Sequence, residues 1–290
     1  MDFRRLSYFL AVAEHGSFTA AAKALFVSQP AVSLAVKELE QELGVELFHR
    51  LGRRVTLTAA GEALVEPARQ VLRDVQVGTA AVAAVTGLAA GRLDLCCLPT
   101  LAVRPGARLI GRFRREYPAV AVDMSVADDP ADLVELLRSG RSELGITEAA
   151  TVPSELQRHE LMDQELVVVL PPGTAWQAGP VSLSRLRRTP FVTTPPGTST
   201  RRLLDEAFAA VGAQPEVVVV TAQREALLPL VLAGAGATLL PESTAHTAVG
   251  EGAVIVRPRP AIRRTVVLAH RSGPLSPAAA VFVELSIPTA

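Results

Sequence analysis

Side chains suited to nucleic-acid recognition lie close together near the N-terminus of this 290-residue chain. Ser28 and Gln29 begin an amphipathic segment, and Ser33 and Lys37 follow on one side of it. Amide and hydroxyl groups can hydrogen-bond base edges, and an ammonium group can hold phosphate. This pattern indicates DNA binding rather than catalysis.

Residues 1–58 supply the helices that would position these side chains. Apolar residues recur from Phe3 to Ala13 at three-to-four spacing, which predicts a helix ending near Gly16. Ser17 can cap a compact, Ala-rich second helix. After a tight turn, Ser28 can cap a third helix that tolerates Pro30 in its first turn and ends at Gly44. Two helices joined by such a turn form a helix-turn-helix, although an ordinary three-helix bundle is the alternative.

A basic hairpin is predicted after the third helix. Two strand-like segments, 45–50 and 55–58, flank a Gly-Arg-Arg tip that contains Arg53 and Arg54. Arginine at such a wing can enter a minor groove or hold phosphate. A solvated turn is the alternative for the two arginines taken alone.

Residues 59–90 predict one long helix with a single apolar stripe. The stripe alternates four and three apart: Leu64, Ala68, Val71, Val75, Gly78, Val82, Val85 and Ala89. A long helix with one apolar stripe needs a partner, so we expect a linker that dimerises the chain. Packing of the stripe on the helix's own domain is the alternative.

Residues 91–290 alternate strand and helix signals, which predict an α/β domain of two subdomains with mostly parallel sheets. Ser/Thr-rich turns and helix N-termini follow several of these strands, and their hydroxyl and N–H groups suit a small anion. The candidate ligand-binding residues are Thr100, Leu101, Thr147, Glu148, Thr194, Gly197 and Thr198. Thr198 and Ser199 can equally be helix caps, and Thr100 a cap or turn residue. Glu148 would repel an anion or bind an amine, so the charge of the ligand stays open.

Composition narrows the class of protein. Acidic and basic residues balance at 29 each, so any DNA-binding surface must be local. We see no signal peptide and no apolar run of membrane-spanning length, and we expect a cytoplasmic protein.

Three rival functions have weaker support. Nucleophile-elbow, zinc-protease and Walker motifs are absent, and the five histidines are scattered, which disfavours an enzyme. A solute-binding protein would not need residues 1–58. A redox regulator would need an exposed, basic thiol site, whereas Cys96 and Cys97 fall within a predicted strand as buried, inert thiols. We therefore expect no catalytic residue, no metal and no cofactor.

The N-terminal zone resembles LysR-type transcriptional regulators over some sixty residues, and the rest resembles them more loosely. The match is carried by Leu6, Phe9-Leu10-Ala11-Val12-Ala13-Glu14, Gly16-Ser17-Phe18-Thr19-Ala20-Ala21-Ala22, Leu25, Val27-Ser28-Gln29-Pro30-Ala31-Val32-Ser33, Leu39-Glu40, Leu43-Gly44, Leu47-Phe48, Arg50, Leu57-Thr58 and Gly61. Segments 113–118 and 231–241 also look like the family's Tyr-Pro and Gly-x-Gly…Leu-Pro stretches.

The resemblance implies a winged helix-turn-helix (1–58), a linker helix that dimerises (59–90) and a periplasmic-binding-protein-like effector domain (91–290). The domain would comprise subdomain I, about 91–161 and 268–290, and subdomain II, about 162–267. The implied function is sequence-specific binding of operator DNA, modulated by a small-molecule effector, with a carboxylate as one candidate. The implied assembly is a homodimer through the linker, and commonly a homotetramer.

Two positions depart from the family's pattern. Leu34-Ala35 replaces the polar or basic residue that often follows the recognition serine, so apolar contact with a thymine methyl would substitute for a hydrogen bond. Glu143 stands where an aspartate often precedes the short strand. The expected DNA contacts are Ser28, Gln29, Pro30, Ser33, Leu34, Lys37, Arg53 and Arg54.

Overall fold

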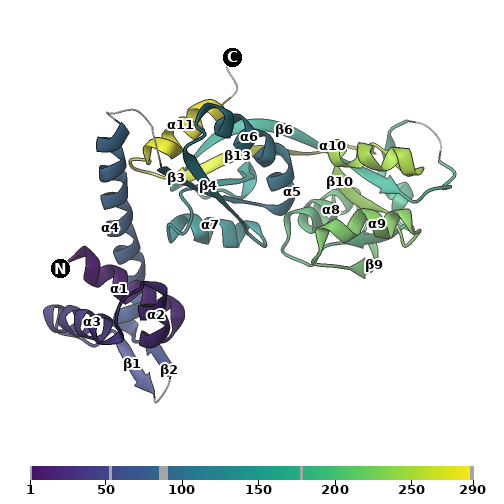
Figure 1. The fold of residues 1–290 in the computed structure, drawn as a ribbon. Coiled ribbons are helices and arrows are strands. Elements are labelled where there is room, and N and C mark those ends of the chain that lie inside the picture. Colours follow the sequence, from purple (N-terminus) through teal and green to yellow (C-terminus); the bar gives the residue numbers. More distant parts are fainter. Residues whose placement is uncertain (1, 52–53, 85–90, 177–178, 288–290) are drawn as a thin grey trace. The chain divides into compact units, whose positions relative to one another are not determined.

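The structure, a computed structural model, describes residues 2–51, 54–84, 91–176 and 179–287. The chain divides into two compact units, which are described separately below (Figure 1). The first unit is built mainly from residues up to Gly91, and the second mainly from Arg92–Leu137 and Ser142–Gly273.

The first unit contains the predicted winged helix-turn-helix. Its helices are α1 (Phe3–His15), α2 (Phe18–Ala24), α3 (Gln29–Leu43) and α4 (Ala59–Ala84), and its antiparallel hairpin is β1 (Phe48–Leu51) with β2 (Arg54–Leu57). The expected helix ends are confirmed. Ser17 Oγ accepts a hydrogen bond from Ala20 N, and Gly16 and Gly44 end α1 and α3 with φ of 58° and 70°. Glycine reaches this left-handed region without a Cβ clash.

One apolar core holds these helices to the hairpin. Val36 and Leu39 of α3 are fully buried beside Phe9 of α1. The rings of Phe9 and Phe48 lie 5.4 Å apart, which ties α1 to the start of the wing. Because α3 buries its apolar face in this core, its opposite face is exposed to solvent.

The first half of α4 belongs to this same core. Ala68 is 1% exposed, and Leu64 and Val71 pack partly buried against the cluster, so packing on the helix's own domain is correct for these three stripe positions. Val75 is 37% exposed and remains available to a partner. The Val82 side chain, and Val85 and Ala89 entirely, lie outside the described residues.

The second unit is built on a seven-stranded sheet in the order β10-β6-β13-β5-β3-β4, with β11 also paired to β6. The strands are β3 (Gly91–Cys97), β4 (Val120–Val126), β5 (Leu144–Glu148), β6 (Leu156–Leu170), β10 (Thr238–Pro241), β11 (Val254–Val256) and β13 (Ile262–Arg271). Smaller two-stranded sheets pair β7 (Val181–Ser182) with β12 (Pro258–Arg259), and β8 (Pro190–Thr193) with β9 (Glu216–Val220).

The expectation of mostly parallel sheets is wrong. β3 and β5 are parallel, as are β8 and β9, but β13 runs antiparallel to both β5 and β6, and β10 and β11 run antiparallel to β6. The reason is that β6 and β13 are two long strands, much longer than the apolar segments 166–170 and 265–269 indicated. Each of the two strands crosses a predicted subdomain boundary, β6 near residue 161 and β13 near residue 267, so the pair connects the two predicted subdomains.

Helices cover these sheets. The helices of the second unit are α5 (Pro99–Leu101), α6 (Ala107–Glu116), α7 (Pro130–Arg138), α8 (Ser199–Ala209), α9 (Leu227–Leu232), α10 (Glu242–Ala245) and α11 (Pro277–Ser286). Two of them, α5 and α8, begin near the ends of strands and contribute to the site. Short α5 follows β3, and α8 follows β8 after the turn at Pro195–Thr198. The carboxyl ends of parallel strands thus meet helix starts, the usual place for a ligand site in α/β sheets.

Within the described residues, no single helix is long and apolar enough to cross a membrane, although the bent pair α2 and α3 passes the same test by length and composition alone.

Two glycines of α4 give opposite predictions for alanine. A Cβ on Gly61 would overlap the backbone carbonyl oxygen of Leu47, whereas a Cβ on Gly78 would meet open space. We expect Gly61→Ala to lower the free energy of unfolding of the first unit by about 1–3 kcal/mol through overpacking. Gly78→Ala should raise it by about 0.5–1 kcal/mol through helix propensity.

Urea unfolding of both variants at low protein concentration would measure the two effects. Equal effects of the two substitutions would contradict the close approach of α4 to the start of the wing.

Candidate functional site

The face of α3 opposite the core carries the residues expected to contact DNA. Residues in a helix follow one another at about 100°, so Pro30, Leu34 and Lys37 form one stripe. This stripe lies opposite the buried Val32 and Leu39. All three of its residues are exposed, and Leu34 is 58% exposed.

Gln29 and Ser33 flank this stripe on one side of α3. Gln29 is exposed and Ser33 is half-buried. Ser28 occupies the N-cap position as expected, but its hydroxyl makes no capping hydrogen bond. The Ser28 hydroxyl at the start of α3 can therefore meet phosphate or a base edge.

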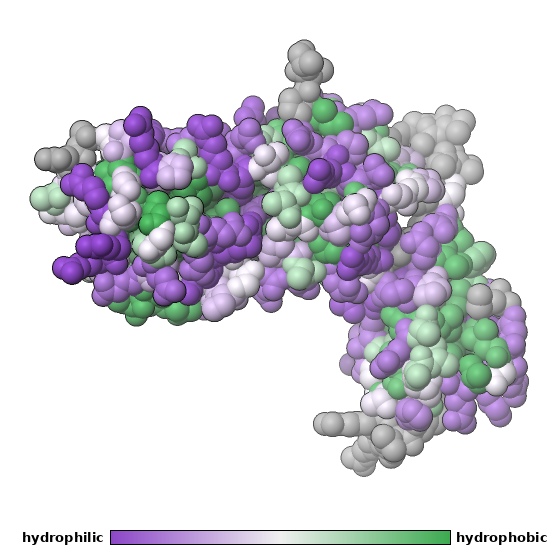
Figure 2. Space-filling view, turned by 180° about the vertical axis from the view of Figure 1, so that it is seen from behind, coloured by the Kyte–Doolittle hydropathy of each residue, from purple (hydrophilic) through white to green (hydrophobic). Residues whose placement is uncertain are grey.

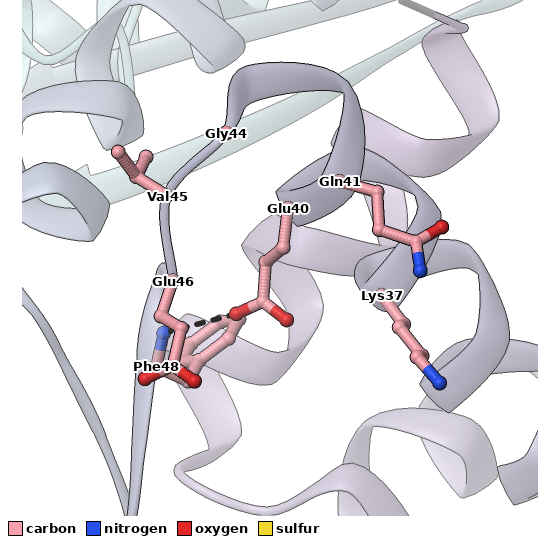
Figure 3. A pocket seen from close by; sticks show the side chains of 7 residues that line it. All are labelled: Lys37, Glu40, Gln41, Gly44, Val45, Glu46 and Phe48. Carbon is pink, nitrogen blue, oxygen red and sulfur yellow. Dashed lines mark hydrogen bonds between the residues drawn. The ribbon is translucent and has the colours of Figure 1, made fainter.

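A groove of about 720 Å³ separates part of α3 from the segment that leads into the wing (Figure 3). Glu40 turns into this groove, where its Oε1 accepts hydrogen bonds from the backbone N–H of Leu47 at 2.8 Å and of Phe48 at 3.3 Å. Lys37 and Gln41 extend away from the wing segment. Glu40 thus fixes the wing to α3, while Lys37 remains directed outward.

Other parts of the expected interface are only partly described. Arg53 lies outside the described residues, and Arg54 belongs to β2 but its side chain is likewise outside them. Phe26, which we did not expect, occupies the turn before α3 with φ of 55° and a side chain 96% exposed. Its neighbours Leu25 and Val27 pack against the core and hold the turn in place.

A buried polar cluster in the second unit joins strands β5, β6 and β13 to helices α5 and α8. The Arg264 guanidinium, 3% exposed, uses all five of its donors. Nε donates to Gln164 Oε1 at 2.8 Å. Nη1 donates to Glu148 Oε1 at 2.8 Å and to Ser199 Oγ at 2.9 Å. Nη2 donates to Thr100 Oγ1 at 2.9 Å and again to Gln164. These five residues, with Arg202, are called the Arg264 cluster.

Glu148 is the anion of this cluster. Its side chain is 1% exposed, and besides the Arg264 contact it accepts hydrogen bonds from Ser199 Oγ and from Arg202 Nη2. Glu148 ends β5, while Ser199 and Arg202 belong to the first turn of α8. One buried carboxylate therefore joins elements of both predicted subdomains.

The two arginines respond differently to this environment. Burial lowers the pKa of the Arg264 guanidinium, and the charge and hydrogen bonding of Glu148 oppose that shift. Burial also acts to lower the pKa of Arg202, but Glu206 and Glu148 outweigh it and raise this pKa overall. Arginine guanidinium groups are not deprotonated in proteins, so the cluster holds two cations around one carboxylate.

The other expected effector residues lie outside the Arg264 cluster. Thr194 Oγ1 and Thr198 Oγ1 lie 2.5 Å apart, and Thr198 also donates to the Pro195 carbonyl, so its hydroxyl does not cap α8. Thr147 Oγ1 lies 3.3 Å from Thr151 Oγ1. Leu101 is fully buried, and Gly197 forms the exposed turn with φ of 90°. Of the seven residues, the structure brings only Thr100 and Glu148 into the Arg264 cluster.

The sequence interpretation missed Arg264, Gln164 and Arg202. Gln164 and Arg264 lie in the charged parts of β6 and β13 that were not assigned to strands. One signal was available, because Arg264 directly precedes the apolar run 265–269 and so lies at the start of a buried strand. An arginine in such a place needs a partner, since arginine is rarely buried unless it is paired.

The two cysteines are buried and free. Burial raises the pKa of the Cys96 thiol to about 11 and that of Cys97 to about 12. Both thiols are therefore protonated at neutral pH and poor nucleophiles, which agrees with the expectation of inert thiols.

Comparison with known proteins agrees with this geometry. A model described as the bacterial regulatory helix-turn-helix protein, lysR family, matches residues 3–62, and one described as the LysR substrate binding domain matches residues 86–288. The chain is 32% identical over 286 residues to a RuBisCO operon transcriptional regulator of Acidithiobacillus ferrooxidans, covering 97% of this chain and 91% of the relative. It is 34% identical over 250 residues to the transcriptional regulator XapR of Escherichia coli K12, covering 84% of each.

Solved structures give the same result. The crystal structure of full-length CbnR complexed with its target DNA is 27% identical, covers 99% of both chains and has a TM-score of 0.70. OxyR from Pseudomonas aeruginosa is 25% identical, covers 99% of this chain and 93% of its own, and has a TM-score of 0.80.

These matches define the chain as a DNA-binding transcriptional regulator with an effector-binding domain. The chain belongs to the LysR family of transcriptional regulators.

The Arg264 cluster gives a test of its own. Glu148→Gln keeps the side chain's size but leaves Arg264 and Arg202 without their shared buried anion. We expect it to lower the free energy of unfolding by about 3–5 kcal/mol. The matched control is Glu206→Gln, which removes another partner of Arg202 from a side chain that is 60% exposed. The control should change stability by about 1 kcal/mol or less.

Chemical denaturation of both variants would measure this difference. Similar stability losses for the two would contradict the assignment of Glu148 as the buried anion of the cluster.

Proposed function

We propose that α3 enters the major groove of operator DNA with the stripe of Pro30, Leu34 and Lys37 facing the bases and backbone. The observation that supports this orientation is the split of α3 into a buried apolar face and an exposed face. Gln29 and Ser33 would hydrogen-bond base edges at one side of the stripe, and Lys37 would hold a phosphate.

Apolar contact would replace one hydrogen bond in this readout. Leu34 has no polar atom on its exposed side chain, so it would recognise the methyl group of a thymine. Ser28 would contact phosphate at the start of α3. Arg53 and Arg54 at the wing would enter the minor groove or hold phosphate.

We propose that the effector, a small polar molecule such as a carboxylate, binds between the two subdomains at the Arg264 cluster. Support comes from the origin of its members, since Thr100 follows β3 and Glu148 ends β5 in the expected subdomain I, whereas Ser199 begins a helix of subdomain II. A ligand that changes the spacing of these elements can favour one quaternary state over another. The regulator would act in the bacterial cytoplasm on nucleoid DNA.

We propose a homodimer formed through the second half of α4, paired into a homotetramer through the effector domains. Val75 supports the first contact because it stays exposed on the predicted stripe. The second has support from edge strand β4, where Met124 and Val126 are 41% and 51% exposed. Figure 2 shows one face of the molecule, on which hydrophobic patches lie among hydrophilic side chains in both units. The domain boundaries near residues 58 and 90 are part of this proposal.

Two substitutions on α3 separate affinity from specificity. Lys37→Ala should weaken binding to all duplexes and reduce the slope of log K against log salt by about one. Gln29→Ala should cost about 1–3 kcal/mol on the preferred site and much less on random DNA.

Fluorescence anisotropy over a salt series would measure both, using the best duplex selected from a random pool. An unchanged salt slope would reject the phosphate role of Lys37, and equal losses on both DNAs would reject a base-reading role for Gln29.

Thr100→Val tests the effector site. It removes the oxygen that accepts from Arg264 while keeping the side chain's shape, so it should reduce the ligand response and leave ligand-free DNA binding nearly unchanged. The matched control is Thr265→Val on the same strand as Arg264, since Thr265 bonds to Asp163 rather than to the cluster.

A thermal-shift screen of small metabolites would identify the ligand, because a molecule that binds only the folded state raises Tm. Its effect on DNA binding would then be compared in the parent and both variants. A parental response in Thr100→Val would place the pocket elsewhere.

A further inference from the structure

The Arg264 cluster has the composition of a carboxylate-binding site. Two guanidinium groups and one hydroxyl converge on a single buried carboxylate, that of Glu148. Ser199 is also the first residue of α8, whose positive dipole end favours an anion. Charge-assisted hydrogen bonds of this kind are those by which proteins hold carboxylate ligands.

Within the described residues, Glu148 is the anion that pairs with Arg264. The other partners of Arg264 are Gln164, Ser199 and Thr100, which carry no charge. Arg202 differs, because it has a second carboxylate partner in Glu206 at 2.8 Å. Removal of the Glu148 carboxylate would therefore leave Arg264 charged, buried and without a counter-ion.

We propose that the Arg264 cluster is a carboxylate-binding site that the chain fills with its own Glu148 side chain. A small carboxylate would bind there only in competition with that side chain. This inference rests on the proposed effector function, which it deepens by naming the ligand class and the group that the ligand must displace.

Competition of this kind has a structural consequence. Glu148 is attached to β5, whereas Ser199 and Arg202 are attached to α8, so the carboxylate links these two elements directly. A free carboxylate can satisfy Arg264 and Ser199 equally well but carries no link to β5. Its binding would release β5 from α8 and so favour a different spacing of the subdomains.

Acetate is the probe that matches the geometry. Glu148→Ala deletes the Cγ, Cδ, Oε1 and Oε2 atoms of the side chain, which correspond to the four heavy atoms of acetate. Wild-type protein should not bind acetate measurably at this position, because the tethered carboxylate has a far higher effective concentration than a free one. Glu148→Gln is the matched control, since its neutral amide still fills the space.

The experiment is a thermal-shift titration of the full-length wild type, Glu148→Ala and Glu148→Gln with sodium acetate. Sodium chloride keeps the ionic strength constant. We expect Glu148→Ala to melt below the wild type and its Tm to rise with the logarithm of the acetate concentration above Kd, by about 5 °C when acetate reaches 100 times its Kd. Wild type and Glu148→Gln should show no such acetate-specific rise over chloride.

Three outcomes would overturn the inference: no acetate-specific rise for Glu148→Ala, an equal rise for wild type, or an equal rise for Glu148→Gln. If Glu148→Ala is insoluble in chloride, the readout becomes its refolding yield. Recovery of folded protein in acetate but not in chloride supports the inference, and loss in both salts overturns it.

The result is separable from that of the metabolite screen. Acetate rescue of Glu148→Ala without any metabolite response in wild type would reject the effector proposal and leave the filled site standing. A wild-type response to a carboxylate, without acetate rescue of Glu148→Ala, would support the effector proposal and reject the filled site.

Discussion

The buried ion pair of Arg264 and Glu148 is the constraint on which the second unit depends. Neither group can be buried alone, because an isolated charge in a protein interior costs far more than a typical domain's stability allows. Each group therefore dictates the position of the other, and the remaining donors of Arg264 fix Thr100, Ser199 and Gln164 as well. The pair thereby determines how β5, α8 and β13 meet.

The first unit follows a simpler rule in which one helix serves two purposes. α3 buries Val32, Val36 and Leu39 in the core and leaves the opposite stripe to solvent. Its orientation is fixed by that burial and by Glu40, which holds the start of the wing through two backbone hydrogen bonds. The exposed stripe thus needs no separate support, because the core that folds the unit also sets the orientation of the helix.

These two constraints differ in kind. The exposed face of α3 is preformed, because a buried apolar core holds the helix. The Arg264 cluster instead links elements of two predicted subdomains through hydrogen bonds and ion pairs, and its anion is the Glu148 side chain.

The sequence alone determined the helix-turn-helix and the ends of its helices, because helix periodicity and end signals depend on residues close together in the chain. It also indicated Thr100, which follows a strand, and Glu148, which ends one. Only the tertiary structure decided that three positions of the α4 stripe pack on their own domain, that the sheet is mixed, and that Arg264 and Gln164 are buried. Glu148 and Arg264 are 116 residues apart in the sequence. A charged residue in a strand is predicted to be exposed unless its partner is known, and that partner is known only from the folded structure.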